Sequence, residues 1–228
     1  MKNKLILLVL LISTACFSIA ARDGSKKISI LGDSYSTYVG HVTPDTNNCW
    51  YGKPDLQKVN DAHRVEDTWW YQLIEEQGLQ LDHNNSYSGT TICNTGYNQA
   101  DFSDRSFITR LTDLGTPDII LIFGGTNDSW AKVPVGEYQY ADWNKEQLYS
   151  FRPAFGYLLS RLKEVYPNAV IYNITNTELS REVAESMDTI CSHYQVKNIK
   201  LTYIDKQSGH PSINGMKQIC KQVSAGMK

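Results

Sequence analysis

The chain has 228 residues, of which 22 are Lys or Arg, 24 are Asp or Glu, and 41% belong to the hydrophobic set. The formal net charge of -2 argues against a nucleic-acid-binding protein, which normally carries a basic excess. The hydrophobic content excludes a disordered chain, and the length fits one domain with a sizeable core.

Residues 1–20 have the pattern of a secretory signal peptide. Two lysines precede an apolar run over residues 5–12, and small residues then supply a cleavage site. The run is much shorter than the roughly 20 residues of a membrane-spanning helix, so we expect no stable membrane span. Lipoprotein anchoring at Cys16 is a weaker alternative, because the residues before it match a lipoprotein cleavage box only loosely. We therefore expect a secreted or periplasmic protein in which residues 21–228 form a single domain.

Short apolar runs alternate with longer helical patterns along the rest of the chain, as expected for parallel strands joined by crossover helices. The clearest run is Ile119 to Phe123, because a strand buried on both faces of a parallel sheet is apolar almost throughout. The strand candidates are residues 27–31, 79–85, 119–123, 169–174 and 201–204.

Four segments have the residue pattern of helices. They are residues 68–77, 155–165, 178–194 and 212–227. Asp67 or Thr68 would cap the first of them. The segments 40–66 and 129–152 are long loops rich in polar and aromatic residues, and loops of that length are usually functional.

Side chains with catalytic potential follow the predicted strands. Ser34 comes after the first strand, Gly89 after the second, Asn127 after the third and His210 after the fifth. The carboxyl ends of parallel strands share one edge of a sheet, so these residues are expected to converge.

Each of the four fits a step of nucleophilic catalysis. Ser34 supplies a hydroxyl nucleophile, and His210 is the candidate base that accepts its proton. The backbone N–H groups of Ser34 and Gly89 and the side-chain amide of Asn127 are candidate donors to an oxyanion. Asp33 and Asp128 lie beside the site, and we expect them to stabilise turns as hydrogen-bond acceptors.

An even number of cysteines follows the predicted signal peptide, and an exported chain favours disulfides. We expect Cys49 to pair with Cys93 and Cys191 with Cys220, although two buried free thiols on the late helices are nearly as good an interpretation. The cysteines show no metal-binding spacing, so the sequence does not support a structural zinc site.

In chain order, the motifs Gly-Asp-Ser, Gly89, Gly-Gly-Thr-Asn-Asp and His-Pro resemble the four blocks of the SGNH (GDSL-type) hydrolase family. The resemblance implies a flavodoxin-like three-layer α/β/α sandwich with a central parallel sheet of about five strands. It also implies hydrolysis of esters or thioesters through an acyl-serine intermediate, without a metal or organic cofactor. It would make Ser34 the nucleophile and His210 the base, with Ser34, Gly89 and Asn127 as the oxyanion hole.

One position departs from the family pattern. The family usually has Asp three residues before the catalytic His, and this chain has Gln207 there. Asp205 can replace it as the group that orients His210 if the loop bulges, or a backbone carbonyl can do so, which would leave a Ser–His dyad.

The aromatic residues give the only hint of a substrate. All five Trp lie between residues 50 and 143, and Trp50, Trp130 and Trp143 fall in the two long loops, where they either form a sugar-binding surface or simply pack. We expect a carbohydrate O-acetylesterase or acylesterase acting on a small-molecule or carbohydrate ester. The alternatives are a lipolytic esterase, lysophospholipase or thioesterase, and a carbohydrate-binding protein on a degenerate hydrolase fold.

Overall fold

The computed structural model describes residues 24–228, so the predicted signal peptide and Cys16 lie outside the described residues. Five parallel strands form the central sheet, in the order β2-β1-β3-β4-β5. They are β1 (Lys27–Gly32), β2 (Gln80–Ser86), β3 (Ile119–Phe123), β4 (Val170–Thr175) and β5 (Lys197–Lys200). In register, Gly32 at the end of β1 lies beside Ser86 of β2 and Phe123 of β3, so these strands end level with one another.

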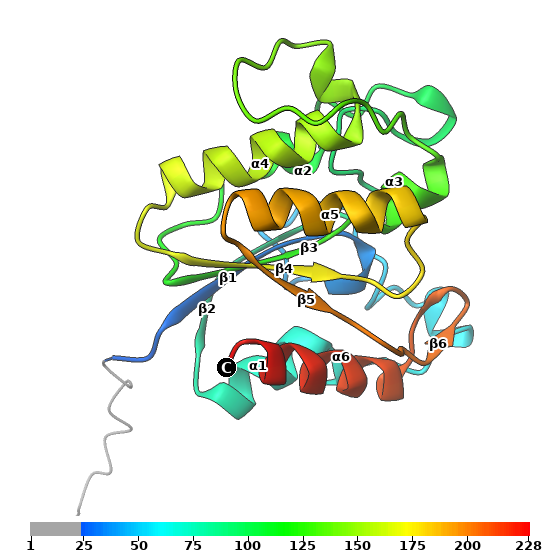
Figure 1. Ribbon diagram of the computed structural model, residues 1–228. Coiled ribbons are helices and arrows are strands. Elements are labelled where there is room, and N and C mark those ends of the chain that lie inside the picture. The colour runs from blue at the N-terminus through cyan, green and yellow to red at the C-terminus, as the bar shows by residue number, and fades with distance from the viewer. Residues whose placement is uncertain (1–23) are drawn as a thin grey trace, which may run out of the picture.

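Helices cover both faces of the sheet, giving the predicted three-layer α/β/α sandwich (Figure 1). One face carries α2 (Phe107–Arg110), α4 (Phe151–Val165) and α5 (Arg181–His193). The other face carries α1 (Trp69–Gln77) and α6 (Ile213–Gly226). The short helix α3 (Thr126–Ala131) directly follows β3.

Two hydrophobic clusters fill the space between the layers. All five residues of β3 are buried. Ile120 and Ile122 belong to the cluster under α2, α4 and α5, whereas Leu121 and Phe123 belong to the cluster over α1 and α6. Alternate side chains of one apolar strand thus hold both layers, which explains why β3 is apolar throughout.

Serine side chains cap the starts of two helices. Ser180 and Ser212 cap α5 and α6 by accepting from Val183 N and Gly215 N. The predicted start of α5 at residue 178 was therefore early. Helix α4 starts at Phe151, before the predicted residue 155, and it accommodates Pro153 in its first turn, where no N–H donor is needed.

The predicted strand over residues 201–204 was wrong, because β5 occupies Lys197–Lys200. This strand lies at the sheet edge, where Ile199 is its single buried residue, so it lacks the apolar run of a central strand. Leu201 donates its N–H to Thr175 O (3.0 Å), and the chain then leaves the ladder. Leu201 and Ile204 are apolar because they pack in the hydrophobic cluster between the sheet and helices α1 and α6, called the α1/α6 cluster below.

The predicted disulfides are absent from the described residues. Cys49, Cys93, Cys191 and Cys220 are buried free thiols. Cys191 lies in the α4/α5 cluster and Cys220 in the α1/α6 cluster, so the sheet separates the two sulfurs. Cys93 likewise turns inward, into the α4/α5 cluster, whereas Cys49 stays in the long loop with its Sγ near Asn47 O (3.5 Å).

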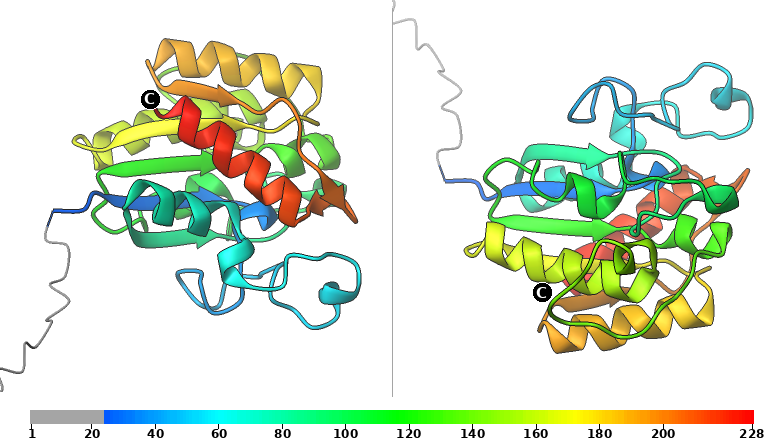
Figure 2. Two further views of the ribbon diagram at one scale, coloured as in Figure 1. Left: turned by 90° about the horizontal axis from the view of Figure 1, so that it is seen from below. Right: turned by 90° about the horizontal axis from the view of Figure 1, so that it is seen from above.

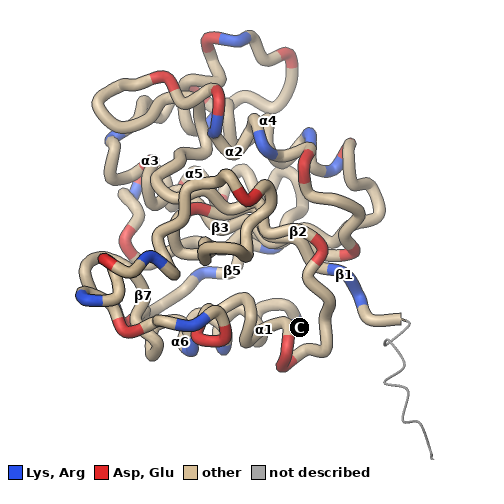
Figure 3. The backbone as a smooth tube through the Cα atoms, turned by 180° about the vertical axis from the view of Figure 1, so that it is seen from behind, with Lys and Arg blue, Asp and Glu red and all other residues tan. Residues whose placement is uncertain are grey.

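The two long loops lie outside the sandwich. Segment 40–66, coloured blue to cyan, projects at the end of the molecule that holds the small hairpin β6 (Lys206–Gln207) and β7 (His210–Pro211) (Figure 2). Basic and acidic residues are interspersed around the described chain (Figure 3). Within residues 24–228, no helix combines the length and apolar character needed to cross a bilayer.

Candidate active site

The predicted site residues lie on segments that leave the carboxyl edge of the sheet. Ser34 begins a 3₁₀ turn (Ser34–Ser36) after β1, and Asn127 lies in α3 after β3. Gly89 lies in the loop after β2, and His210 starts β7. The sheet order places β1 between β2 and β3, where the chain reverses its winding direction, the usual ligand position in an open parallel sheet.

Ser34 and His210 are in hydrogen-bond contact. Ser34 Oγ lies 3.0 Å from His210 Nε2, as required for proton transfer from the hydroxyl to the imidazole. The sharp turn before Ser34 is held by Asp33, whose Oδ1 accepts from Tyr35 N (3.0 Å). Gly32 is needed for close approach, because a Cβ there would lie 2.5 Å from Ser86 Oγ.

Three candidate oxyanion donors flank this pair. Within the described chain, neither the Ser34 nor the Gly89 backbone N–H has a hydrogen-bond acceptor. Gly89 has φ +85°, and an added Cβ would meet no atom within 4 Å, so its backbone borders open space. Both N–H groups are free to bind the negative oxygen of a tetrahedral intermediate.

The Asn127 side chain is oriented by its neighbours. Its Nδ2 donates to Thr90 O (2.9 Å), and its Oδ1 accepts from the Tyr97 hydroxyl (2.7 Å). These contacts assign the amide so that its nitrogen also lies 3.5 Å from Asp33 Oδ2. Its two hydrogens therefore face Thr90 O and Asp33, and an oxyanion would have to take the place of the longer Asp33 contact. Sequence reasoning missed Tyr97, which lies in an irregular segment with no motif.

A backbone carbonyl, and not Asp205, faces the second imidazole nitrogen. His210 Nδ1 lies 3.2 Å from Ser208 O, across a turn in which Ser208 and Gly209 have φ angles of 50° and 76°. The Asp205 carboxylate instead accepts from the Ser212 hydroxyl at the start of α6. The structure therefore does not bring Asp205 to the imidazole, and a backbone carbonyl takes the orienting position in the predicted Ser–His dyad.

Gln207, at the position where the family usually has Asp, also turns away from His210. Its Oε1 accepts from Asp61 N (2.8 Å), and its Nε2 donates to Asp61 Oδ2 (3.2 Å). Gln207 therefore links the β6–β7 hairpin, called the histidine hairpin below, to the long loop 40–66.

Aromatic rings surround the imidazole. Trp50 stacks on His210 with ring centroids 3.8 Å apart and an interplanar angle of 7°. Tyr35, Tyr51 and Trp130 approach it at 5.4, 6.3 and 6.5 Å. Burial lowers the pKa of His210 from 6.5 to about 4, against the opposing effect of the Ser208 carbonyl. The imidazole is therefore neutral at pH 7 and able to accept a proton.

This environment predicts activity in mildly acidic solution. A protonated imidazole cannot accept the Ser34 proton, and His210 protonates only near its lowered pKa of about 4. We expect the acidic limb of the pH profile of kcat/KM on p-nitrophenyl acetate to have its midpoint near that value, well below the ordinary 6.5. A midpoint at 6.5 or above would show that water reaches the imidazole and would contradict the buried geometry.

Three charged side chains are buried beneath the site. Burial raises the pKa values of Asp33 and Asp128 to about 7, and it lowers that of Arg110 to about 9. Asp128 accepts from Ile92 N at 2.9 Å, so it stabilises the loop after β2 as the predicted hydrogen-bond acceptor. Arg110 was not anticipated, because helix α2, which it ends, lies outside the predicted helices and a lone arginine gives no signal in a single sequence.

Arg110 joins the ends of two strands to the loop that follows β2. Its Nη1 donates to Asn85 O in β2, and its Nη2 donates to Gly32 O in β1 (3.2 Å) and to Thr90 Oγ1 (3.1 Å). Its Nε donates to Arg105 O (2.8 Å). The guanidinium therefore positions the segments that carry Ser34 and Gly89.

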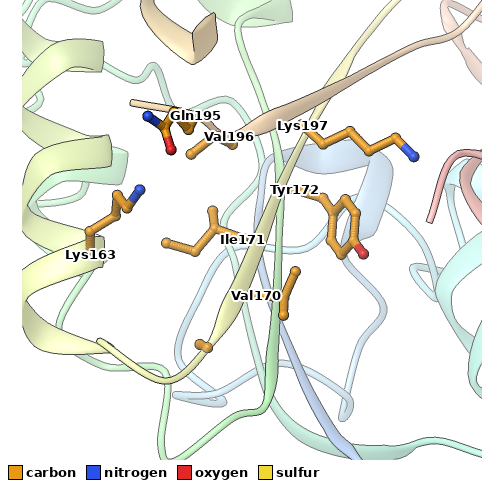
Figure 4. A pocket seen from close by; sticks show the side chains of 8 residues that line it. Lys163, Val170, Ile171, Tyr172, Gln195, Val196 and Lys197 are labelled. Carbon is orange, nitrogen blue, oxygen red and sulfur yellow. The ribbon is translucent and has the colours of Figure 1, made fainter. Parts of the chain in front are cut away.

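A separate hollow lies at the opposite end of the strands (Figure 4). It opens between α4 and the starts of β4 and β5, with Lys163, Tyr172 and Lys197 among its lining residues. It contains none of the predicted site residues.

In the part of the chain that the structure describes, no group of three or more His, Cys, Asp or Glu side chains is placed to hold a metal ion.

Comparisons with known proteins show the family of this chain. The model of the GDSL-like lipase/acylhydrolase family matches residues 26–227. A crystal structure named as a GDSL-like lipase from Bacteroides uniformis has 65% sequence identity and a TM-score of 0.87, over 88% of this chain and 94% of that chain. One from Bacteroides ovatus has 55% identity and a TM-score of 0.87, over 90% and 98%.

More distant structures share the fold. A family two carbohydrate esterase from Clostridium thermocellum in complex with cellohexaose has 16% identity and a TM-score of 0.57, over 89% of this chain and 63% of that chain. Comparison with curated proteins gave no match. From the family match and the two Bacteroides structures, the chain belongs to the GDSL-like lipase/acylhydrolase family, the SGNH hydrolases, and is an ester-hydrolysing enzyme.

Proposed function

We propose that this enzyme removes small acyl groups, above all acetyl, from a carbohydrate by way of an acyl-serine intermediate. The observation that carries the proposal is the 3.0 Å contact between Ser34 Oγ and His210 Nε2 with aromatic side chains around it. Export through the segment 1–20 belongs to the proposal, and the amino terminus of the mature protein tests it.

The chemistry proceeds in two balanced halves. Ser34 Oγ attacks the ester carbonyl while His210 Nε2 takes the hydroxyl proton, and the oxyanion is held by the N–H groups of Ser34 and Gly89 and by Asn127. When the tetrahedral intermediate breaks down, the bond between the acyl carbon and the alcohol oxygen breaks, and the alcohol leaves with the proton from His210. Water then attacks the acyl-serine carbonyl and gives a proton to His210 Nε2. As the bond from the acyl carbon to Ser34 Oγ breaks, His210 returns that proton to Oγ, and the acid is released.

Trp130 is the aromatic side chain best placed to contact a sugar. Its side chain is 41% exposed, and its ring lies near Gly209 and His210. An exposed indole face packs well against the C–H face of a sugar ring. The fold shared with an esterase whose structure holds cellohexaose is compatible with such a substrate.

Trp143 and Tyr140, in the second long loop, support packing and not sugar binding. Trp143 meets Tyr157 of α4 edge-on, and Tyr140 stacks on His193 at the end of α5. Neither contact is at the site. The candidate sugar-binding surface is therefore narrower than the sequence suggested.

A panel of substrates tests the acyl group and the alcohol together. We expect kcat/KM to fall from p-nitrophenyl acetate to the octanoyl ester, and acetylated sugars to be hydrolysed. In Trp130→Ala, KM for an acetylated oligosaccharide is expected to rise about 10-fold, the loss of one ring contact, while KM for p-nitrophenyl acetate changes little.

The same substrate panel tests the second candidate function, that of a lipolytic enzyme. The names of the two Bacteroides structures favour this function. A rate that rises from acetyl to octanoyl would favour that candidate. Equal effects of Trp130→Ala on sugar and p-nitrophenyl substrates would contradict a sugar-binding role for this ring.

A further inference from the structure

No described carboxylate contacts the histidine of this dyad, which leaves open what stabilises the imidazolium formed in each half-reaction. The Asp205 carboxylate accepts from Ser212. Asp61 is occupied by Gln207 and by Ile213 N (2.8 Å). The nearest full contact with the imidazole face is the indole of Trp50, parallel to it at 3.8 Å.

Trp50 is held rigidly next to the nucleophile. Its backbone N–H donates to Thr37 Oγ1 (2.9 Å), and the Thr37 hydroxyl donates to Ser34 O (3.0 Å). The adjacent Tyr51 donates its hydroxyl to Pro211 O (2.7 Å). One residue pair of the long loop is thus fixed to both the serine turn and the histidine hairpin.

A second part of the same loop clamps the hairpin. Asn60 Nδ2 donates to Pro211 O (3.1 Å), and Ser208 Oγ donates to Val59 O (3.1 Å). Together with the Asp61 and Gln207 pair, these bonds fix the turn whose Ser208 carbonyl faces His210 Nδ1. The loop 40–66 therefore determines both the position of the imidazole and what covers its face.

We propose that Trp50 is the positioning residue for His210 in this enzyme, with its indole face stabilising the imidazolium in place of the family's carboxylate. The inference deepens the proposed function and rests on it. A cation above an indole face is attracted by the ring quadrupole, and the attraction strengthens when water is excluded. The imidazole and the Trp50 indole form a parallel stack and not an edge contact, so the imidazole lies over the indole face.

Other groups around His210 do not supply this stabilisation. Lys206 opposes the imidazolium charge, although its Nζ lies 2.8 Å from Glu178 Oε2. The Tyr35 hydroxyl donates to Gly209 O (2.8 Å), as Tyr51 does to Pro211 O. Trp130 meets the imidazole at an interplanar angle of 72° from 6.5 Å. The groups left to stabilise the imidazolium are the indole face of Trp50 and the Ser208 carbonyl.

The test compares Trp50→Phe with Trp50→Leu on p-nitrophenyl acetate. Both variants keep an apolar side chain over the imidazole, but only Phe keeps a π face. We expect Phe to retain kcat within about 3-fold and Leu to lose about 10-fold or more, with KM unchanged in both. The acidic limb of kcat/KM in the Leu variant is expected to move to lower pH, because its imidazolium is less stable.

Trp143→Leu is the matched control, since this tryptophan also lies in a long loop but packs against α4. Its kcat and acidic limb are expected to match those of the wild type. Equal kcat values for the Phe and Leu variants would overturn the proposal, and so would a limb that moves up toward 6.5 in the Leu variant, because Trp50 would then only exclude water.

Protein made with 5-fluorotryptophan covers the case in which Trp50→Leu does not fold. Fluorination weakens the π face with little change in shape, so we expect kcat to fall in the wild type and not in Trp50→Phe. Equal effects in both would overturn the proposal. Failure of the proposed function looks different, because the wild type itself would then hydrolyse no acetyl ester.

Discussion

The Ser34→Ala variant is expected to lose at least about 10⁴-fold in kcat on p-nitrophenyl acetate while its thermal unfolding stays close to that of the wild type. The reason is that Ser34 Oγ is the hydroxyl within reach of the His210 imidazole, at 3.0 Å. Without it no acyl intermediate forms. Release of p-nitrophenol, followed by absorbance, measures the loss.

Ser36→Ala is the matched control from the same 3₁₀ turn. Its hydroxyl is buried, and the residues that the structure describes give it no hydrogen-bond partner, so its removal is expected to leave activity intact. Labelling by a fluorophosphonate should reach Ser34 in the wild type and disappear in Ser34→Ala. Turnover by Ser34→Ala within 10-fold of the wild type would place the nucleophile elsewhere.

Replacing Arg110 with methionine should lower the free energy of unfolding by about 3–5 kcal/mol. The change removes donors from Asn85 O, Gly32 O and Thr90 Oγ1, which are buried and cannot all recruit water. A loss of this size is a large part of the stability of a typical domain. Urea unfolding followed by circular dichroism gives the value.

Arg105→Met provides the comparison for Arg110. Arg105 lies on the same segment, but its guanidinium pairs with the largely exposed Asp104, and such surface pairs contribute about 1 kcal/mol or less. A shift for Arg110→Met as small as that for Arg105→Met would show that the carbonyls find other partners, contrary to the bracing role assigned to the guanidinium.

The parts of the fold that were predictable are those in which one residue pattern has one outcome. The run Ile119 to Phe123 admits little besides a central strand, and its bounds were predicted correctly. The edge strand β5 was misplaced because only Ile199 faces the core, whereas Leu201 is apolar for another packing reason. Apolar character alone does not distinguish a strand from an extended segment under a helix.

The site divides in the same way. The juxtaposition of Ser34 and His210 follows from motifs at the ends of parallel strands, and the structure has it, while their catalytic roles stay predictions. The indole stack of Trp50 and the bonds of Tyr97 depend on how irregular loops cross one another. No periodic residue pattern indicates how irregular loops cross, so these contacts could not be predicted from the sequence.

The buried thiols have a practical consequence for producing the protein. Burial raises the pKa values of Cys191 and Cys220 to about 12, and those of Cys49 and Cys93 also rise. Thiol exchange and oxidation proceed through the thiolate, which is scarce under these conditions. Over residues 24–228 the native fold contains no disulfide, so non-covalent interactions alone hold it. The same fold should therefore form in a reducing or an oxidising host compartment, and refolding should need no redox buffer.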